Sequence, residues 1–259
     1  MDAREFYDDL GSEYDLMVAW TQRLSREQVF FRRVFHEGGV RRVLDAACGT
    51  GMHALAFARE GLECVGADLS PVMVEAARAN ARKAGVELRF EPAGFGELAD
   101  RLGGGFDAVT CVGNSLPHLL DDESLRACLR DFANALAPGG LLVIQNRNYD
   151  RLLRERQRFT PPASRIGPEG ETLFLRITEY PPAGARRDDL VEFTVLTLRR
   201  HGQTWTMSER TTPLRALRSA ALRAALERTG FSAIRVYGGY GFEPFDSPGS
   251  ADLVMVATR

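Results

Sequence analysis

The sequence predicts an α/β fold in which a mostly parallel sheet carries helices on both faces, with a small antiparallel β insert. Between residues 40 and 150, short apolar runs alternate with amphipathic stretches, which is typical of βαβ units. Residues 151–212 break this rhythm with segments of alternating polarity that indicate antiparallel strands. The α/β pattern then returns. The predicted parts are a helical N-terminal cap at 1–40, an α/β core at 41–150, the insert at 151–212, and a completion of the core at 213–259.

The elements of the core follow from its hydrophobic pattern. The predicted strands cover 42–46, 63–68, 87–91, 106–112 and 140–145. The predicted helices between them cover 53–60, 71–84, 95–102 and 122–136. Ser70 and Pro71 are typical of the N-cap and the first position of a helix. Because the strands alternate with helices, we expect their carboxyl ends to meet at one edge of the sheet.

The flanking parts have patterns of their own. In the N-terminal part, Tyr14, Met17, Trp20 and Leu24 recur at the three- and four-residue spacing of a helix. In the insert, alternation predicts strands at 173–179, 190–200 and 203–211. In the last part, we predict a helix at 219–229 and strands at 233–237 and 252–258.

Composition excludes several classes of protein. The 259 residues hold 33 basic and 35 acidic side chains, a formal net charge of −2, so sequence-independent binding of nucleic acid is not favoured. No signal-peptide pattern and no apolar run of membrane-spanning length occur. The four cysteines are widely spaced without CxxC, which predicts reduced core thiols and no metal site. We therefore expect a cytoplasmic protein with neither nucleic-acid nor membrane partners.

A glycine-containing turn follows the first core strand. The strand 42–46 leads into Ala47-Cys48-Gly49-Thr50-Gly51, and the next strand ends in Asp68. Glycines at such a turn let a ligand approach the backbone, and an acid at the end of the next strand can bind both hydroxyls of a ribose. The spacing also fits the permissive dinucleotide fingerprint, so the motif alone leaves two classes of ligand open.

Charge distinguishes the two ligands. A dinucleotide would place its anionic pyrophosphate at this turn, close to the carboxylate of Asp45. S-adenosylmethionine instead carries an ammonium and a sulfonium, which an acid at the end of the first strand attracts. Asp45 therefore favours S-adenosylmethionine over a nicotinamide cofactor, and a dehydrogenase is the less favoured hypothesis.

Two stretches of this region resemble motifs of the class I S-adenosylmethionine-dependent methyltransferases. Residues 43–51, VLDAACGTG, resemble their first motif, and residues 66–73, GADLSPVM, resemble their second. The resemblance implies a Rossmann-like sheet whose last strand is antiparallel. It also implies that Asp68 binds the ribose and that Leu69 and Met73 flank the adenine. Gly94 and Phe95 stand where the family usually has an acid or amide beside an apolar residue, so adenine recognition relies on backbone groups and Phe95.

Two further motifs narrow the resemblance. Residues 113–119, GNSLPHL, and 147–150, RNYD, are similar to stretches of the glycine and glycine/sarcosine N-methyltransferases. The resemblance implies that Arg147 binds the carboxylate of an amino acid and that Asn114 borders the methyl acceptor. It also implies an N-terminal segment that folds over the donor and contributes Trp20 and Arg23. We further expect Tyr14 and the N-terminal helix to close the site against water. The full predicted donor-binding set is Trp20, Arg23, Asp45, Ala47, Gly49, Gly51, Asp68, Leu69, Met73, Gly94, Phe95 and Val112.

The predicted function is methyl transfer from S-adenosylmethionine to a small molecule, with S-adenosylhomocysteine as the product. The acceptor atom favoured by the resemblance is the nitrogen of an amino acid or amine. An O-methyltransferase of another metabolite and a non-catalytic S-adenosylmethionine-binding module stay open as alternatives. Family members are often oligomeric, so a homo-oligomer is an expectation of the same resemblance.

Several of these residues also have structural interpretations. Trp20 is equally well explained as a core anchor, and His118 is better explained by a capping role than by acid/base chemistry. Cys48 is interpreted as a small packed residue of the motif and not as a nucleophile. Arg147 has an alternative partner in Asp150, and Tyr149 has one in the insert.

Overall fold

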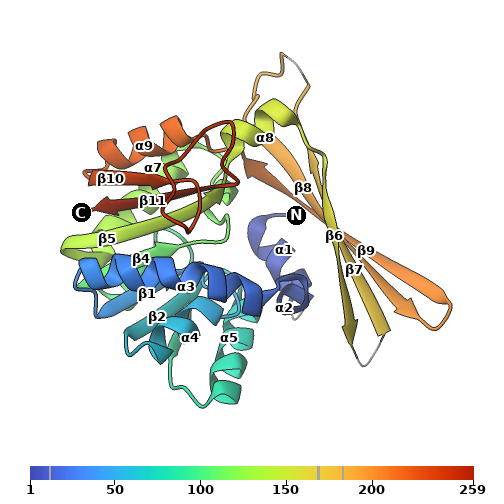
Figure 1. Cartoon of the computed structure of the whole chain (residues 1–259), viewed down its shortest axis with the longest axis horizontal. Coiled ribbons are helices and arrows are strands. Elements are labelled where there is room, and N and C mark those ends of the chain that lie inside the picture. The colour runs from blue at the N-terminus through green and yellow to red at the C-terminus, as the bar shows by residue number, and fades with distance from the viewer. Residues whose placement is uncertain (12, 168–169, 183) are drawn as a thin grey trace.

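The larger of two sheets forms the centre of the molecule (Figure 1). The computed structural model describes residues 1–11, 13–167, 170–182 and 184–259, so the predicted parts 1–40 and 151–212 each contain residues outside the description. The strands of this sheet are β1 (Arg42–Ala46), β2 (Glu63–Asp68), β3 (Arg89–Pro92), β4 (Phe106–Cys111), β5 (Leu136–Arg147), β10 (Ser232–Tyr237) and β11 (Asp252–Thr258).

The strand order of this sheet is β10-β11-β5-β4-β1-β2-β3. β1 pairs in parallel with β2 and β4, and β4 with β5, whereas β11 runs antiparallel to both β5 and β10. The predicted α/β fold, with a mostly parallel sheet and an antiparallel last strand, is confirmed. The order also reverses between β1 and β4, and ligands of open α/β sheets bind at such a reversal.

Helices cover both faces of the sheet. One face carries α6 (Leu98–Leu102), α7 (Asp122–Ala135) and α9 (Ser219–Arg228), and the other carries α3 (Trp20–Glu37), α4 (Met52–Arg59) and α5 (Pro71–Ala84). Alternate strand residues feed the two cores: Leu44 packs on the first face and Val43 on the second. All four cysteines are buried and free.

The boundaries of α5 follow the predicted signals. The Ser70 hydroxyl accepts a hydrogen bond from the Met73 amide at 3.0 Å, Pro71 is the first helical residue, and Gly85 ends the helix in a left-handed conformation. Other boundaries moved: the helix predicted at 95–102 is only α6, and β5 begins at Leu136, earlier than predicted.

The insert is a four-stranded antiparallel sheet beside the core (Figure 1). Its strands are β6 (Phe159–Gly167), β7 (Gly170–Glu179), β8 (Leu190–His201) and β9 (Thr204–Arg215), in that order. The prediction omitted β6 because Pro161 and Pro162 interrupt its pattern. The structure accommodates the two prolines on an edge strand, where the register shifts between Thr160 and Ala163. A second element absent from the sequence prediction is α8 (Tyr149–Glu155), which Asn148 caps.

The N-terminal segment lies between the core and the insert (Figure 1). It contains α1 (Ala3–Leu10) and α2 (Glu13–Met17) before α3. Phe6 and Leu10 of α1 are buried in one cluster with Met73 of α5 and with Phe174 and Val195 of the insert. This segment therefore fixes the insert opposite the carboxyl ends of the parallel strands.

Candidate active site

The turn after β1 brings backbone groups to the carboxyl edge of the sheet. Ala47 and Gly49 both have positive φ angles, of 59° and 55°, and the Gly49 amide donates to Oδ2 of Asp68 at 2.8 Å. The Ser70 amide donates to the other oxygen, Oδ1, at 2.9 Å. Asp68 therefore links the ends of the first two strands, and its burial raises the pKa of the carboxyl to about 6.

A cavity of about 280 Å³ opens at this edge, and ten of the twelve predicted donor-binding residues line it. These are Trp20, Arg23, Ala47, Gly49, Asp68, Leu69, Met73, Gly94, Phe95 and Val112. They come from α3, the turn after β1, the end of β2, α5 and the segments after β3 and β4. Sequence motifs far apart in the chain thus meet around one space, named below the donor cavity.

The other two predicted residues, Asp45 and Gly51, lie behind the lining of the donor cavity. Asp45 is 1% exposed; its Oδ1 accepts from the Thr110 hydroxyl at 2.9 Å, and Oδ2 has no partner among the residues described. Burial raises the pKa of this carboxyl. Gly51 is required by packing, because a Cβ there would lie 2.8 Å from the Phe90 ring at a φ of +77°.

Asp15 fastens the N-terminal segment over the glycine turn. Its Oδ1 accepts from the Trp20 indole at 2.7 Å and from the Thr50 hydroxyl at 2.5 Å, and its Oδ2 accepts from Asn80 at 3.0 Å. The sequence pattern gave no signal for Asp15, because its partners lie on three different elements. Trp20 both lines the donor cavity and anchors this network, so its two interpretations do not exclude each other.

A second cavity, of about 270 Å³, lies between the core, the N-terminal segment and the insert. It is named here the acceptor cavity. Of the predicted catalytic residues, Tyr14, Asn114 and Arg147 all line it, and Tyr14 is also in contact with Trp20 of the donor side. The two cavities share Tyr7, Tyr14, Arg23, Gly113 and His118 in their linings, so they adjoin each other.

Asn114 holds the loop after β4 against the end of β5. Its φ is 70°, its Oδ1 accepts from the Arg147 amide at 3.0 Å, and its Nδ2 donates to the Tyr149 hydroxyl at 3.0 Å. Tyr149 in turn packs with Val191 and Leu214 of the insert. The side chain of Asn114 thus positions both walls of the acceptor cavity.

The Arg147 side chain faces the acceptor cavity and makes no ion pair or hydrogen bond with any described residue. The alternative partner, Asp150, instead accepts from the Ser219 amide at 2.9 Å. A guanidinium in this position is available for a ligand carboxylate, which it can bind through two parallel hydrogen bonds.

Two residues of the shared wall were not among the predicted site residues. The Tyr7 hydroxyl lies 3.3 Å from Nε2 of His118, while Nδ1 of His118 is buried without a partner among the described residues. Burial lowers the pKa of His118 to about 4 and raises that of Tyr7. Both side chains are therefore neutral near pH 7. The spacing of Phe6 and Leu10 could have drawn attention to α1, but not to its contact with His118.

Cys48 also lines the donor cavity, and burial raises the pKa of its thiol well above the usual value. A protonated thiol is a poor nucleophile, which agrees with its interpretation as a packed residue. Among the residues described, no group of three or more His, Cys, Asp or Glu side chains is arranged to hold a metal. Within the same residues, no helix is long and apolar enough to cross a membrane.

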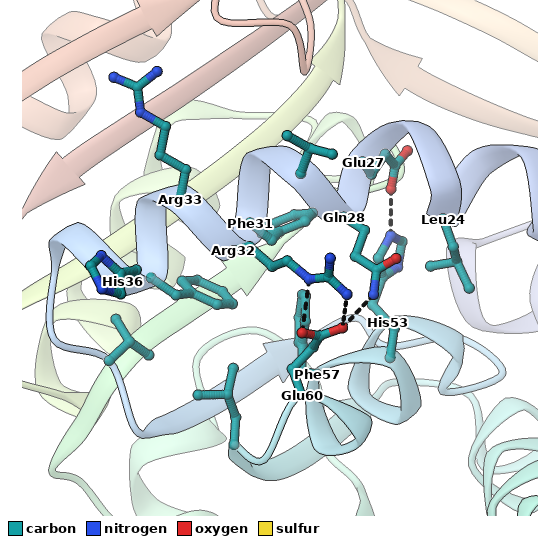
Figure 2. A pocket seen from close by; sticks show the side chains of 15 residues that line it. Leu24, Glu27, Gln28, Phe31, Arg32, Arg33, His36, His53, Phe57 and Glu60 are labelled. Atoms are coloured by element: carbon teal, nitrogen blue, oxygen red, sulfur yellow. Dashed lines mark hydrogen bonds and ion pairs between the residues drawn. The ribbon is translucent and has the colours of Figure 1, made fainter.

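A larger groove, of about 630 Å³, lies between α3 and α4 (Figure 2). The pair of Glu27 and His53, 2.6 Å apart, forms a wall between this groove and the two cavities. Glu60 bridges the groove by accepting from Arg32 at 2.8 Å and from Gln28 (Figure 2). None of the predicted site residues lines the groove.

The fold resembles that of solved S-adenosylmethionine-dependent methyltransferases. The CcbJ methyltransferase from Streptomyces caelestis matches with a TM-score of 0.78 at 21% identity, over 99% of this chain and 98% of that one. The S-adenosylmethionine-bound amino pentose methyltransferase CalS10 from Micromonospora echinaspora matches with a TM-score of 0.68 at 23% identity, over 93% and 92% of the two chains.

The sequence itself matches a narrower set of proteins. Residues 43–140 match a family model described as a methyltransferase domain. The glycine/sarcosine N-methyltransferase of Parasynechococcus marenigrum (strain WH8102) is 39% identical over 150 residues, which are 58% of this chain and 53% of that protein. The chain spans about half the length of the curated relatives it matches. The predicted methyltransferase domain and its resemblance to glycine N-methyltransferases are confirmed.

Proposed function

We propose that this protein transfers a methyl group from S-adenosylmethionine to the nitrogen of a small amino acid or amine. The observation that carries the proposal is the contact between the two cavities, which share Tyr7, Tyr14, Arg23, Gly113 and His118. A ligand in the donor cavity and a ligand in the acceptor cavity would meet at this shared wall. The names of the similar proteins, glycine/sarcosine N-methyltransferases among them, support the same reaction.

The residues of the donor cavity fit the donor. Asp68 offers carboxylate oxygens at the position expected for a ribose, and Leu69, Met73 and Phe95 supply apolar surface for an adenine. The partnerless Oδ2 of Asp45 is a buried acceptor beneath the turn. We assign Asp68 to ribose binding and Asp45 to a through-space attraction for the cationic end of the donor, because Asp45 does not line the cavity.

The residues of the acceptor cavity fit an amino acid. Arg147 would bind its carboxylate, and Asn114 would keep Arg147 and the loop after β4 in register. When bound, S-adenosylmethionine supplies a methyl group on a sulfonium. The acceptor nitrogen forms the N–C bond as the S–C bond breaks, the sulfur keeps the electron pair, and the nitrogen loses a proton to solvent. Tyr14 and Trp20 would exclude water, so alignment of nitrogen, carbon and sulfur supplies most of the acceleration.

The test separates donor binding from transfer. Asp68→Ala is expected to abolish binding of S-adenosylmethionine in calorimetry, because the ribose loses its acceptor. Asp107→Ala is a matched control, since Asp107 also accepts two backbone amides, from Arg41 and Arg42, but at the opposite edge of the sheet. Arg147→Ala is expected to retain donor binding and to lose methyl transfer.

The acceptor is found by a donor-dependent screen of amino acids and amines in which mass spectrometry detects the gain of one methyl group. Methylation of an alcohol in place of an amine would establish an O-methyltransferase. Donor binding without any product would establish a binding module. If Arg147→Ala keeps full turnover, the assignment of Arg147 to the carboxylate is wrong.

We also propose a cytoplasmic location and a small-molecule acceptor without nucleic-acid or membrane partners. The four free, buried cysteines support a reducing compartment, and the net charge of −2 does not favour nucleic acid. A homo-oligomer stays a prediction based on the resemblance to oligomeric families, and the sedimentation velocity of the purified protein tests it.

A further inference from the structure

Besides Arg147, the acceptor cavity is lined by Arg176, which a small neutral amino acid such as glycine would leave without a partner. Arg176 of β7 lines the cavity together with Arg147, which stands at the end of β5. The two arginines come from different sheets, one from the core and one from the insert. The cavity thus has a cation on each of two walls.

Both guanidinium groups are free of protein partners among the residues described. Neither Arg147 nor Arg176 forms an ion pair there, and Nε of Arg176 is buried without any hydrogen-bond partner. Burial and the positive charges of Arg147 and Arg165 lower the pKa of Arg176. A buried charged donor without an acceptor is unfavourable, so the protein bears this arrangement at a cost that an anionic ligand would remove.

The two acids that line the acceptor cavity already have partners within the protein. Glu27 accepts from Arg23 at 2.9 Å and from His53 at 2.6 Å. Asp252 accepts from Gln145 at 2.8 Å. The lining holds four arginines, Arg23, Arg26, Arg147 and Arg176, against these two acids. The cavity therefore has an excess of positive charge although the whole chain has a net charge of −2.

We propose that the methyl acceptor is a dianionic amine, such as an amino dicarboxylic acid, whose two carboxylates bind Arg147 and Arg176. This inference rests on the proposed function, because it places the acceptor in the cavity next to the donor. Arg147 anchors the carboxylate that any amino acid has, and Arg176 selects acceptors with a second one. The amino nitrogen then lies towards the wall that both cavities share.

The first test compares acceptors that differ only in charge. We expect kcat/KM for aspartate or glutamate to exceed that for asparagine or glutamine about ten- to hundredfold, the range of a charge-assisted hydrogen bond. Arg176→Gln should remove this preference by lowering kcat/KM for the acids far more than for the amides, whereas Arg147→Gln should impair every acceptor. Arg130→Gln, on the exposed surface of α7, is the control and should change nothing. Equal rates for acid and amide in the unmodified protein would overturn the inference while leaving N-methylation intact.

A second test does not depend on catalysis. Succinate and its monoamide have no amine, so their affinities for the protein loaded with S-adenosylhomocysteine report on the two arginines alone. We expect succinate to bind at least tenfold more tightly than the monoamide, and Arg176→Gln to abolish the difference. Equal affinities in the unmodified protein contradict the inference whether or not methyl transfer is found. A preference for succinate without any methylated amine would instead retain the dianion site and reject the proposed function.

Discussion

We expect Asp68 to make donor binding sensitive to mild acid. Its pKa of about 6 lies within reach of ordinary buffers, and both oxygens already accept backbone amides from Gly49 and Ser70. A proton on either oxygen opposes these donors and removes an acceptor for the ribose. Because the ionised form binds and exists above the raised pKa, affinity is lost as the pH falls through 6.

We expect the affinity for S-adenosylhomocysteine to fall about fourfold between pH 7.5 and 5.5, in proportion to the ionised fraction of Asp68. Calorimetric titration over this range measures the change. Asp68→Asn should bind weakly and without this pH dependence. His118 does not interfere, since its pKa of about 4 lies below the range. Full affinity of the unmodified protein at pH 5.5 would show that the ionised carboxyl is not needed.

Substitution of Gly51 tests whether packing requires a glycine at this position of the turn. A Cβ at Gly51 would lie 2.8 Å from the Phe90 ring and 2.9 Å from Cβ of Ala77, at a φ of +77°. Gly61 has a similar φ of +87° but nothing within 4 Å of its added Cβ. The pair thus separates backbone strain from overpacking.

We expect Gly51→Ala to lower the free energy of unfolding by about 1–3 kcal/mol more than Gly61→Ala, the usual range for overpacking. Urea denaturation of the two variants measures the difference. Equal losses would mean that the turn yields to the added methyl group. In that case packing against Phe90 would not account for Gly51.

Helix α2 is attached to the core through a single carboxylate, that of Asp15. Asp15 accepts from Trp20, Thr50 and Asn80, which belong to α3, the glycine turn and α5. Asp15→Ala leaves these donors without an acceptor, which costs about 1–3 kcal/mol of stability for the closed arrangement of the segment. We expect roughly tenfold weaker donor binding and faster hydrogen exchange over residues 13–24.

Glu75→Ala is the matched control for Asp15, because within the described residues Glu75 pairs with Arg78 alone, on the surface of α5. It should change neither donor affinity nor exchange. If Asp15→Ala keeps the donor affinity of the unmodified protein, the N-terminal segment does not close the donor cavity.

Sequence periodicity predicted the elements of the core well because each is a local pattern. The strands of β1 and β2 and the helix α5 coincide with the predicted ranges, since alternation and Ser70-Pro71 mark them directly. α8 and β6 were missed, because arginines and prolines obscure their apolar faces. Local sequence patterns do not predict that β6 is an edge strand, in which a register shift accommodates Pro161 and Pro162.

The site residues that can be predicted from the sequence are those that lie in local motifs. Asp68 and Arg147 stand at strand ends within recognisable motifs, and both reach the cavities. The contact of Tyr7 with His118 could not be predicted, because the two residues are 111 positions apart in the sequence. Arg176 could not be predicted either, because it lies in the insert, to which none of the recognised motifs extends. Charge alone predicts that Asp45 contacts the ligand. The side chain is instead buried behind the cavity wall, because the burial of a carboxylate at a strand end depends on packing that the sequence does not specify.

At the scale of the whole molecule, the N-terminal segment joins the core and the insert into one unit. Besides the apolar contacts of α1, the buried Arg210 of β9 forms ion pairs with Asp9 and, at 3.1 Å, with Glu13. Because both cavities are bounded by this segment and the acceptor cavity also by the insert, the parts must hold together for the site to exist.

The two tryptophans report on two parts of this assembly, since Trp20 begins α3 next to the N-terminal segment and Trp205 lies in β9. In the single-tryptophan proteins made by Trp205→Phe and Trp20→Phe, we expect each fluorescence transition in urea to coincide with the circular-dichroism transition of the same protein. Adding Arg210→Gln removes one side of a buried ion pair, so the fluorescence transition of Trp205 should move to lower urea than the circular-dichroism transition of the same protein. Arg158→Gln removes an exposed pair with Glu179 and the contact of Arg158 with the Phe159 ring, both within the insert, and should leave the curves together. Separate transitions in the unmodified background would mean that the insert folds independently of the N-terminal segment, and that Arg210 is not what couples them.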